Sequence, residues 1–167
     1  MPSRRQFVFV LASAAALAPV VAWLAGPSIN GAAMADKAFP VQKTDEEWRR
    51  LLTSDQYNVL RRHSTERPGS SALDHEKRRG TFICAGCGNA LFASETKFNS
   101  GTGWPSFWKP LPDAIGTSTD RALFMVRTEV HCARCGGHLG HVFDDGPRPT
   151  GLRYCMNGVA MTFTPAT

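Results

Sequence analysis

The sequence predicts a small, mainly β domain preceded by short helices. After Gly80, short runs of β-branched and aromatic residues alternate with turns that carry glycine and proline, a spacing typical of an all-β core. Before Gly80, apolar residues recur at helical spacing behind capping residues. The chain of 167 residues is 43% hydrophobic and 20% charged, which fits one folded domain with a short extension and excludes global disorder.

Two short helices are expected before the β region. Residues 44–47 form a capping-box pattern (Thr, then Glu three positions later). Three apolar residues follow it at helical spacing: Trp48, Leu51 and Leu52. A second helix is predicted over 55–62, with Tyr57, Val59 and Leu60 as its apolar side chains. The stretch 67–71 then breaks regular structure because it carries proline and glycine.

Strands are expected at 81–83, 123–126 and 159–163. Turns that separate them are predicted at 101–103, 110–116 and 144–151, where glycine and proline gather.

Residues 1–35 are predicted to be an export signal. Arg4 and Arg5 precede an apolar stretch over 7–25, and 33–35 reads Ala-Met-Ala, a cleavage pattern. The adjacent arginines resemble a twin-arginine signal. An uncleaved membrane anchor is the alternative, but the weak hydrophobicity and the cleavage pattern favour removal.

The mature chain is then expected to be one domain over 36–167, with its core over about 44–163. We expect it in the periplasm or otherwise exported, without stable membrane association once the signal is cleaved, and membrane-anchored if it is not. The net charge of +5 comes from 19 basic and 14 acidic residues. These charges form no long block of one sign, so no nucleic-acid partner is expected.

Four of the five cysteines form two C-x-x-C-G motifs. They are Cys84, Cys87, Cys132 and Cys135. Two such pairs can close a tetrahedral site, each pair forming a tight turn that aims both sulfurs at one point, and a closed Cys₄ shell indicates structural Zn²⁺. Two disulfides, one redox-active pair beside a structural pair, and iron are the alternatives. Zinc is favoured, because export of an already folded protein would allow metal loading before oxidation.

The fifth cysteine has polar neighbours. If 151–158 is a strand, Arg153, Cys155 and Asn157 share one face. A cationic Arg153 would stabilise the thiolate, which is the reactive form, and Asn157 offers a donor and an acceptor. A buried core residue is the alternative for an isolated cysteine.

Two histidines lie on a segment that looks flexible because of its glycines. His138 and His141 belong to the Gly-His-Leu-Gly-His stretch at 137–141 and are candidate proton donors near neutral pH. A second metal site is the alternative, although the sequence shows no obvious carboxylate or cysteine partner for it.

An aromatic cluster lies at 101–108, where Trp104, Phe107 and Trp108 occur within five residues. These rings are either core filling or the lining of an apolar pocket. The pattern alone does not separate the two.

Together these segments resemble the zinc-containing methionine-R-sulfoxide reductases. The resemblance runs from about residue 44 to residue 163. Its motifs are at 84–87, 97–107, 137–143, 145–147 and 153–157. It implies a fold of two antiparallel β-sheets with N-terminal helices and a structural Cys₄ zinc site. It also implies an enzyme that reduces methionine-R-sulfoxide, in oxidised proteins or as the free amino acid, and we expect a monomer.

The resemblance implies the following roles. Cys155 attacks the sulfoxide sulfur and is left as a sulfenic acid. His141 protonates the departing oxygen, while His138 and Asn157 hold water or that oxygen. Three residues bind substrate or tune the site: Trp104, Arg153 and Phe143. Trp104 forms a platform for the substrate methyl group, and Arg153 lowers the thiol pKa.

The sequence departs from the family pattern at Thr102. Many relatives carry a second, resolving cysteine there, and relatives often have serine at the position of Gly158. If four cysteines hold zinc, Cys155 has no internal partner. We therefore expect an external thiol, from a thioredoxin-like protein or a small molecule, to reduce the sulfenic acid. Alternatives from other classes are a zinc-ribbon-like binding module and thiol–disulfide exchange through one C-x-x-C.

Overall fold

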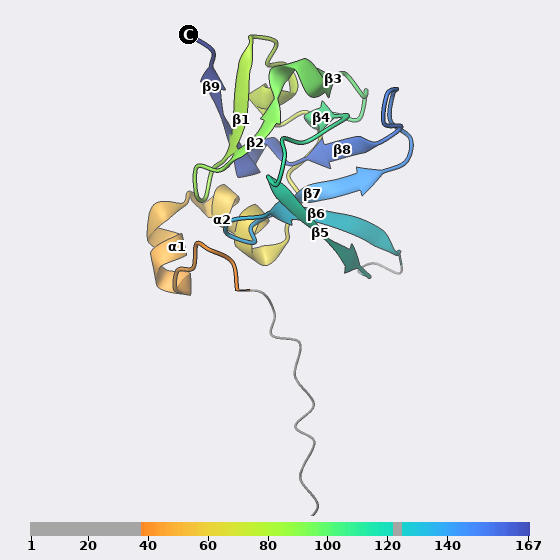
Figure 1. The fold of residues 1–167 in the computed structure, drawn as a ribbon. Coiled ribbons are helices and arrows are strands. Elements are labelled where there is room, and N and C mark those ends of the chain that lie inside the picture. Colours follow the sequence, from red (N-terminus) through yellow and green to blue (C-terminus); the bar gives the residue numbers. More distant parts are fainter. Residues whose placement is uncertain (1–37, 122–124) are drawn as a thin grey trace, which may run out of the picture. The chain divides into compact units, whose positions relative to one another are not determined.

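Two antiparallel sheets form the body of the domain in the computed structural model, which describes residues 38–121 and 125–167 (Figure 1). The smaller sheet has the order β2-β1-β9, and the larger has the order β3-β4-β8-β7-β6-β5. The predicted pair of sheets is therefore confirmed. The strands are β1 Gly80–Cys84, β2 Ala90–Ala93, β3 Lys97–Phe98, β4 Ser106–Phe107, β5 Ile115–Asp120, β6 Arg127–Cys132, β7 His138–Phe143, β8 Arg153–Met156 and β9 Met161–Pro165.

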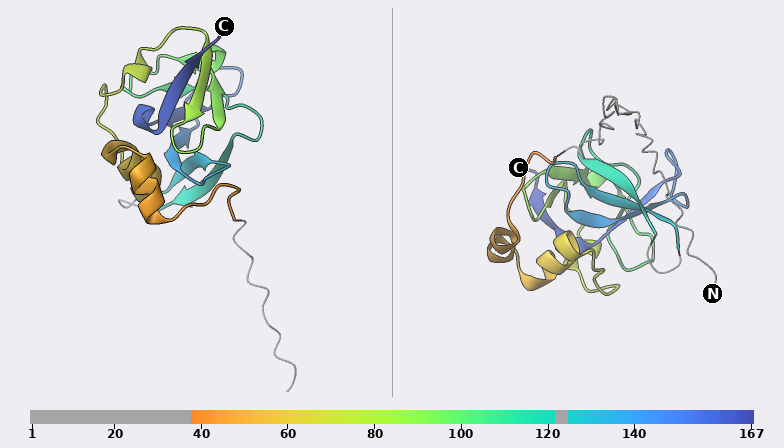
Figure 2. Two further views of the ribbon diagram at one scale, coloured as in Figure 1. Left: turned by 90° about the vertical axis from the view of Figure 1, so that its left-hand side faces the viewer. Right: turned by 90° about the horizontal axis from the view of Figure 1, so that it is seen from below.

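Two helices precede the strands. α1 spans Asp45–Leu51 and α2 spans Ser54–Arg62. The predicted capping box of α1 is present, with the Thr44 side chain accepting from the Glu47 backbone N–H. α2 packs against β7 and against η4, a short 3₁₀ helix at Gly158–Ala160 (Figure 2). Two further 3₁₀ turns are η1 at Ala72–Asp74 and η2 at Ser94–Thr96.

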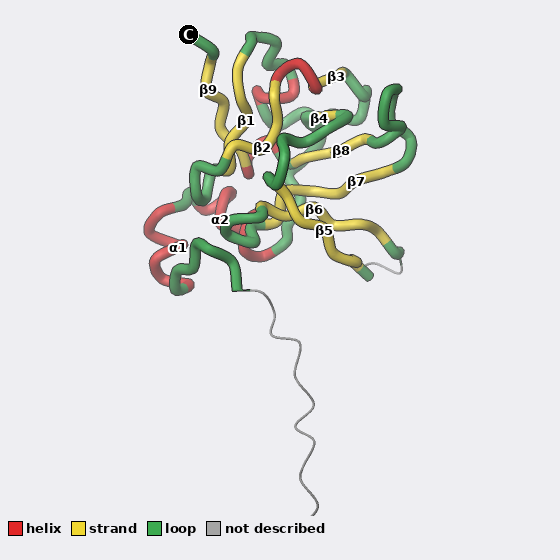
Figure 3. Tube along the Cα trace, viewed as in Figure 1, coloured by secondary structure: helices red, strands yellow, loops and turns green. Residues whose placement is uncertain are grey.

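Strands are the main regular element of the described chain (Figure 3), but several predicted boundaries were wrong. Of the three apolar residues at helical spacing, Trp48 and Leu52 are buried, whereas Leu51 is 54% exposed. α2 begins one residue early because Thr53 caps it and pairs with Gln56. The last strand begins at Met161, since the residues just before it belong to η4.

The strand predicted at 123–126 falls partly outside the described residues. Met125 and Val126 are described; they precede β6, are exposed and form no strand. The turn predicted over 110–116 ends early, because β5 begins at Ile115.

Aromatic rings join the two sheets. Phe82 on β1 and Phe92 on β2 both contact Phe107 on β4, with ring centroids 4.9 Å and 4.3 Å from it. All three side chains are fully buried. The aromatic residues at 101–108 therefore differ in burial: Phe107 belongs to the core, whereas Trp104 is only partly buried.

The predicted export signal and its cleavage point lie outside the described residues. Within residues 38–121 and 125–167, no helix has the length and apolar character needed to cross a bilayer.

Candidate active site and metal centre

The two C-x-x-C-G motifs form matching turns. One follows β1 and the other follows β6. The amide of Gly88 donates to the Cys84 carbonyl, and the amide of Gly136 donates to the Cys132 carbonyl, both at 2.9 Å. Both glycines have a positive φ, near 70° and 66°, as the motif predicts. Each turn therefore presents its two sulfurs in the same way.

The four sulfurs gather into one cluster. Sγ–Sγ distances are 3.7 Å between Cys84 and Cys135 and 3.5 Å between Cys87 and Cys132, and all four sulfurs lie within 4.8 Å of one another. A tetrahedral ion with metal–sulfur bonds of about 2.3 Å would separate its ligands by about 3.8 Å. None of the five cysteines is in a disulfide. The cluster could therefore hold a metal ion.

The N-terminal segment and α2 brace this cluster. Arg61 on α2 donates to the Cys135 carbonyl at 3.0 Å while its guanidinium stacks over the Trp48 ring. The Phe39 ring covers Gly136, where an added Cβ would lie 2.3 Å from it. The second turn thus has little room for any residue other than glycine.

Strand pairing places a row of polar side chains across the larger sheet. Directly opposed positions run from Ser106 on β4 through Cys155, His141 and Glu129 to Ser118 on β5. Directly opposed residues of antiparallel strands point to the same face. Cys155 therefore lies between the buried Ser106 and the buried His141.

A register shift brings His138 to the same face. His138 and His141 are three residues apart, which in a regular strand would place them on opposite faces. The pairing of β6 with β7 shifts between Val130 and His131, the geometry of a β-bulge. The two imidazole rings consequently lie 5.4 Å apart. The segment predicted to be flexible is in fact a buried strand.

Gly140 is required in that strand because β8 runs against it. A Cβ at this position would lie 2.1 Å from the Cys155 carbonyl oxygen and 3.0 Å from the Met156 Cα. Since both of those atoms are backbone, no rotamer change would relieve the contact. The glycine lets β7 approach the strand that carries Cys155.

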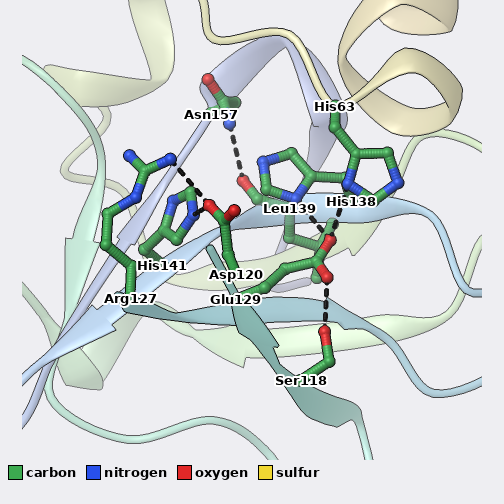
Figure 4. A network of polar contacts seen from close by, with 9 residues as sticks. All are labelled: His63, Ser118, Asp120, Arg127, Glu129, His138, Leu139, His141 and Asn157. Atoms are coloured by element: carbon green, nitrogen blue, oxygen red, sulfur yellow. Dashed lines mark hydrogen bonds and ion pairs between the residues drawn. The ribbon is translucent and has the colours of Figure 1, made fainter. Parts of the chain in front are cut away.

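Each histidine of β7 pairs with a carboxylate from another strand of the larger sheet: His141 with Asp120 at the end of β5, and His138 with Glu129 on β6 (Figure 4). His141 Nε2 lies 2.8 Å from Asp120 Oδ2, which also accepts from Arg127 at 2.7 Å. His138 Nδ1 lies 2.7 Å from Glu129 Oε1. The sequence reasoning missed both acids, because their strand pairing is not encoded in any local motif.

The pKa values of His141 and Glu129 are shifted from their ordinary values. Burial lowers the pKa of His141 below its ordinary value, while the hydrogen bond to Asp120 acts in the opposite direction. The hydrogen bond with His138 lowers the pKa of Glu129 to about 2. Glu129 is therefore a carboxylate at neutral pH.

A cavity of about 190 Å³ opens beside Cys155. Its lining residues are Thr65, Trp104, Arg127, Gly140, His141, Phe143, Cys155 and Asn157. Five of the seven predicted active-site residues line it, and His138 and Arg153 lie next to residues that do. A larger cavity of about 620 Å³ contains neither cysteine nor histidine in its lining.

Arg153 forms an ion pair that the sequence did not predict. Its guanidinium donates to both carboxylate oxygens of Asp145, each at 2.8 Å, and lies 4.4 Å from the centre of the Phe143 ring. The hydrogen bonds to Asp145 are the main cause of the raised pKa of Arg153, and Cys155 adds a smaller contribution. Arg153 is therefore near the thiol but shared with an acid.

Asn157 lies just beyond β8, and its amide is occupied by backbone. Nδ2 donates to the Leu139 carbonyl at 3.0 Å, and Oδ1 accepts from the Glu66 amide at 3.0 Å. In this structure the side chain ties the loop that carries Glu66 to β7. That is a positioning contact between two walls of the cavity.

Glu66 is the residue that sequence reasoning overlooked most completely. Besides its contact with Asn157, its carbonyl accepts from the Trp104 indole N–H at 3.2 Å. Its carboxylate accepts from the amides of Gly158 and Val159 at 2.6 Å and 2.9 Å. Burial raises the pKa of this carboxyl, and those two hydrogen bonds oppose the rise. One residue thus joins the Trp104 loop to the segment after Cys155.

Thr102 contacts Cys155 directly. Its Oγ1 lies 3.8 Å from the Cys155 Sγ and 2.8 Å from the Ser100 hydroxyl, which lies 2.7 Å from that of Ser106. Ser106 in turn donates to the Trp104 carbonyl. A chain of three hydroxyls therefore leads from the thiol into the sheet.

Fold and site together define the class of protein. It is a small β domain with a four-cysteine cluster and, apart from it, a single thiol beside an imidazole in a small cavity. A thiol in a cavity, apart from a cluster that could hold a metal, fits the class of thiol-dependent enzymes with a structural metal site.

Comparison with known proteins gives the family. The model of the SelR domain matches residues 52–165. The peptide methionine sulfoxide reductase MsrB of Methanosarcina barkeri is 54% identical over 131 residues, covering 78% of this chain and 91% of that protein. Those of Bradyrhizobium diazoefficiens and Agrobacterium fabrum are 55% and 52% identical over 126 and 134 residues, covering 75% and 79% of this chain and 91% and 99% of their own lengths. The chain belongs to this family of methionine sulfoxide reductases and is an enzyme of that class.

Replacing the Glu66 carboxylate should loosen the site. In Glu66→Gln one acceptor oxygen becomes an NH₂ group that faces a backbone N–H, so we expect the free energy of unfolding to fall by about 2 kcal/mol. Urea unfolding measures this. Glu46→Gln, at an exposed position on α1, is the control and should change stability by less than about 0.5 kcal/mol. Equal effects of the two changes would contradict the role given to Glu66.

Proposed function

We propose that this chain reduces methionine-R-sulfoxide to methionine, with Cys155 as the nucleophile. The observation that carries the proposal is the position of the Cys155 thiol, beside His141 in a cavity that Trp104 and Phe143 line. Membership of the methionine sulfoxide reductase family supports the reaction. We expect protein-bound and free sulfoxide to share this site.

The reaction transfers one oxygen atom. The Cys155 sulfur attacks the sulfoxide sulfur, and a proton is delivered to the sulfoxide oxygen because an unprotonated oxide is a poor leaving group. The methionine sulfur is reduced to a thioether, and Cys155 is oxidised to a sulfenic acid. The attacking group enters as a thiol, so atoms balance without any other reagent in this step.

His141 is the proposed proton donor. The hydrogen bond to Asp120 favours its protonated form against the effect of burial, so Asp120 is proposed to keep a proton available there. His138 and Asn157 are proposed to order the oxygen or a water, Asn157 through the Nδ2 hydrogen that its bond to the Leu139 carbonyl does not use. Trp104 and Phe143 offer ring faces to the methyl and sulfur groups of the substrate. The sulfur gains positive character as its oxygen is protonated, and a ring face favours that charge.

The four-cysteine cluster is proposed to hold one structural Zn²⁺. The sulfur separations fit a tetrahedral ion, and four thiolates leave no position for water or substrate. When bound, zinc would fasten the turn after β1 to the turn after β6. Its task is to hold the fold, and the reaction takes place at a different sulfur.

One assay with the mature chain tests this function. Both epimers of a methionine sulfoxide are supplied with a dithiol, and bound zinc is measured on the same sample. We expect turnover of the R epimer and about one zinc per chain. Cys155→Ser should abolish turnover while zinc content and folding persist, which also separates a reductase from a zinc-ribbon-like binding module or from exchange through one C-x-x-C. Turnover of the S epimer alone, or full activity of the serine variant, would overturn the proposal.

We propose further that an external thiol completes each cycle. The other four cysteines form the cluster, and the hydroxyl of Thr102 stands next to Cys155 where a resolving thiol would have to be. A thioredoxin-like protein or a small thiol would attack the sulfenic sulfur, form a mixed disulfide with release of water, and be displaced by a second thiol.

Thr102→Cys should restore an internal route. The side chains already approach to 3.8 Å, so a small shift would allow a disulfide between positions 102 and 155. One turnover without reductant should leave a sulfenic acid in the parent chain, detected by a sulfenic-acid-specific label. The variant should instead show the disulfide by mass spectrometry. Thr117→Cys, at an exposed position on β5, is the control and should behave as the parent. An intramolecular disulfide to Cys155 in the parent would refute the external-thiol cycle.

We also propose that residues 1–35 are a twin-arginine-type signal and that the mature domain is exported as a monomer. The support is the sequence pattern of the segment, together with the start of the family match at residue 52. N-terminal sequencing of the protein recovered from the exported fraction should give Asp36 as its first residue. A chain that keeps its N-terminus and stays with the membrane would instead support an uncleaved anchor.

A further inference from the structure

A second cluster of metal-binding side chains lies at the edge of the site. His63, Glu129 and His138 each present a ligand atom, and these atoms lie within 4.8 Å of one another. The two imidazoles approach the same carboxylate oxygen: the Nδ1 atoms of His63 and His138 lie 3.0 Å and 2.7 Å from Glu129 Oε1 (Figure 4). The sequence raised a second metal site as an alternative for His138 with His141, whereas this cluster joins His138 to His63 and Glu129.

We propose that His63, Glu129 and His138 form a second metal site, which takes a divalent ion of the Zn²⁺ class. Two imidazoles and one carboxylate are a donor set that binds zinc with a remaining position for water. This site is distinct from the four-cysteine cluster, with which it shares no residue.

The geometry needs only a small adjustment to accept an ion. Bonds of about 2.0–2.1 Å from zinc to nitrogen and oxygen place neighbouring ligands about 3.3 Å apart in a tetrahedron. The His63–Glu129 distance of 3.0 Å must therefore lengthen by about 0.3 Å, and the His138–Glu129 distance of 2.7 Å by about 0.6 Å. His63 can supply the first movement because its side chain is 61% exposed. A rotation of the Glu129 side chain would supply the second.

The backbone conformation of His63 is one in which a histidine is unusual. His63 follows α2 in the left-handed conformation, with φ 56° and ψ 29°, a position where glycine or asparagine is the usual residue. In this conformation the imidazole reaches back to Glu129 on β6. The contact joins the end of α2 to the strand next to the β5 edge of the larger sheet.

An ion has both an entrance and space for water ligands. A cavity of about 520 Å³ is lined by all three ligand residues, and it shares Thr65, Arg127 and His141 with the cavity at Cys155. The other charged groups that line it are Asp120, Arg121 and Arg127, so the surroundings add one net positive charge, which opposes a cation. The affinity must therefore come from the three ligands.

Occupation of this site would control the reductase, a consequence that rests on the proposed function. A metal on Nδ1 replaces the hydrogen bond between His138 and Glu129 and fixes the imidazole in one tautomer. His138 lies against His141, with ring centroids 5.4 Å apart. Excess metal should then inhibit sulfoxide reduction reversibly, with relief by a chelator.

Binding is tested without any turnover. The untagged chain carrying Cys155→Ser, which removes the reactive thiol as a competing ligand, is titrated with Zn²⁺ by calorimetry after its tightly bound metal has been counted. We expect one further ion per chain. His63→Asn keeps a residue suited to the left-handed position and should weaken this binding about tenfold or more, since one of three ligands is lost. His75→Asn, at an exposed histidine outside the cluster, is the control and should bind as the parent.

Two results would overturn the proposal: no zinc beyond the tightly bound metal, or equal affinity in His63→Asn and the parent.

Shifts of the His63 and His138 ring signals on adding Zn²⁺, followed by NMR, should accompany binding at this site. Inhibition by Zn²⁺ is measured in chains with Cys155 intact, and each rate is normalised to the metal-free rate of the same chain. The inhibition constant should be higher for His63→Asn than for the parent. If the chain proves inactive on methionine sulfoxide, the calorimetry still decides the metal site. If it is active and binds no second ion, only the metal site fails.

Discussion

The pairing of β7 with β8 is the contact on which the candidate site depends. It sets His141 directly opposite Cys155, and it is possible only because Gly140 leaves room for the β8 backbone. A one-residue slip of β8 would send Cys155 to the opposite face of the sheet, toward the core that Met156 now occupies. The register of β7 with β8 therefore decides whether the Cys155 thiol faces His141 or is buried in the core.

Two other features support the positions of the strands in the larger sheet. The aromatic contacts of Phe107 fix β4, the other neighbour of β8, against the smaller sheet. The cysteine cluster brings the end of β6 to the end of β1, and β6 is the strand that supplies Glu129. Both features act at the ends or on the far side of the larger sheet. Neither feature contributes a side chain to the cavity beside Cys155.

Local features of the sequence predicted much of this architecture, and non-local pairing accounts for what it missed. The capping box at Thr44 and the glycines after each cysteine pair act within a few residues, and both behave as expected. The family resemblance led to the correct arrangement of sheets. The partners of the histidines were not predictable, because Asp120 and Glu129 reach them through strand pairing and a register shift across β6 and β7. Glu66 was missed for the same reason, since its partners lie 38 to 93 residues away.

The polar groups around Cys155 differ from those that the sequence indicates. An arginine two residues from a thiol favours the thiolate, but Arg153 gives both sides of its guanidinium to Asp145, so its charge is shared with an acid. The Thr102 hydroxyl is a second polar group at this sulfur, with its oxygen 3.8 Å from the Cys155 Sγ. A hydroxyl accepts a hydrogen bond from a thiol and donates one to a thiolate or a sulfenate. The hydrogen bonds from Thr102 through Ser100 can therefore reverse their direction when the protonation or oxidation state of the sulfur changes. A thiol at position 102 would be a weaker hydrogen-bonding group, though it would supply an internal reductant. The proposed dependence on an external thiol and the hydroxyl chain at Cys155 are thus two consequences of the same residue.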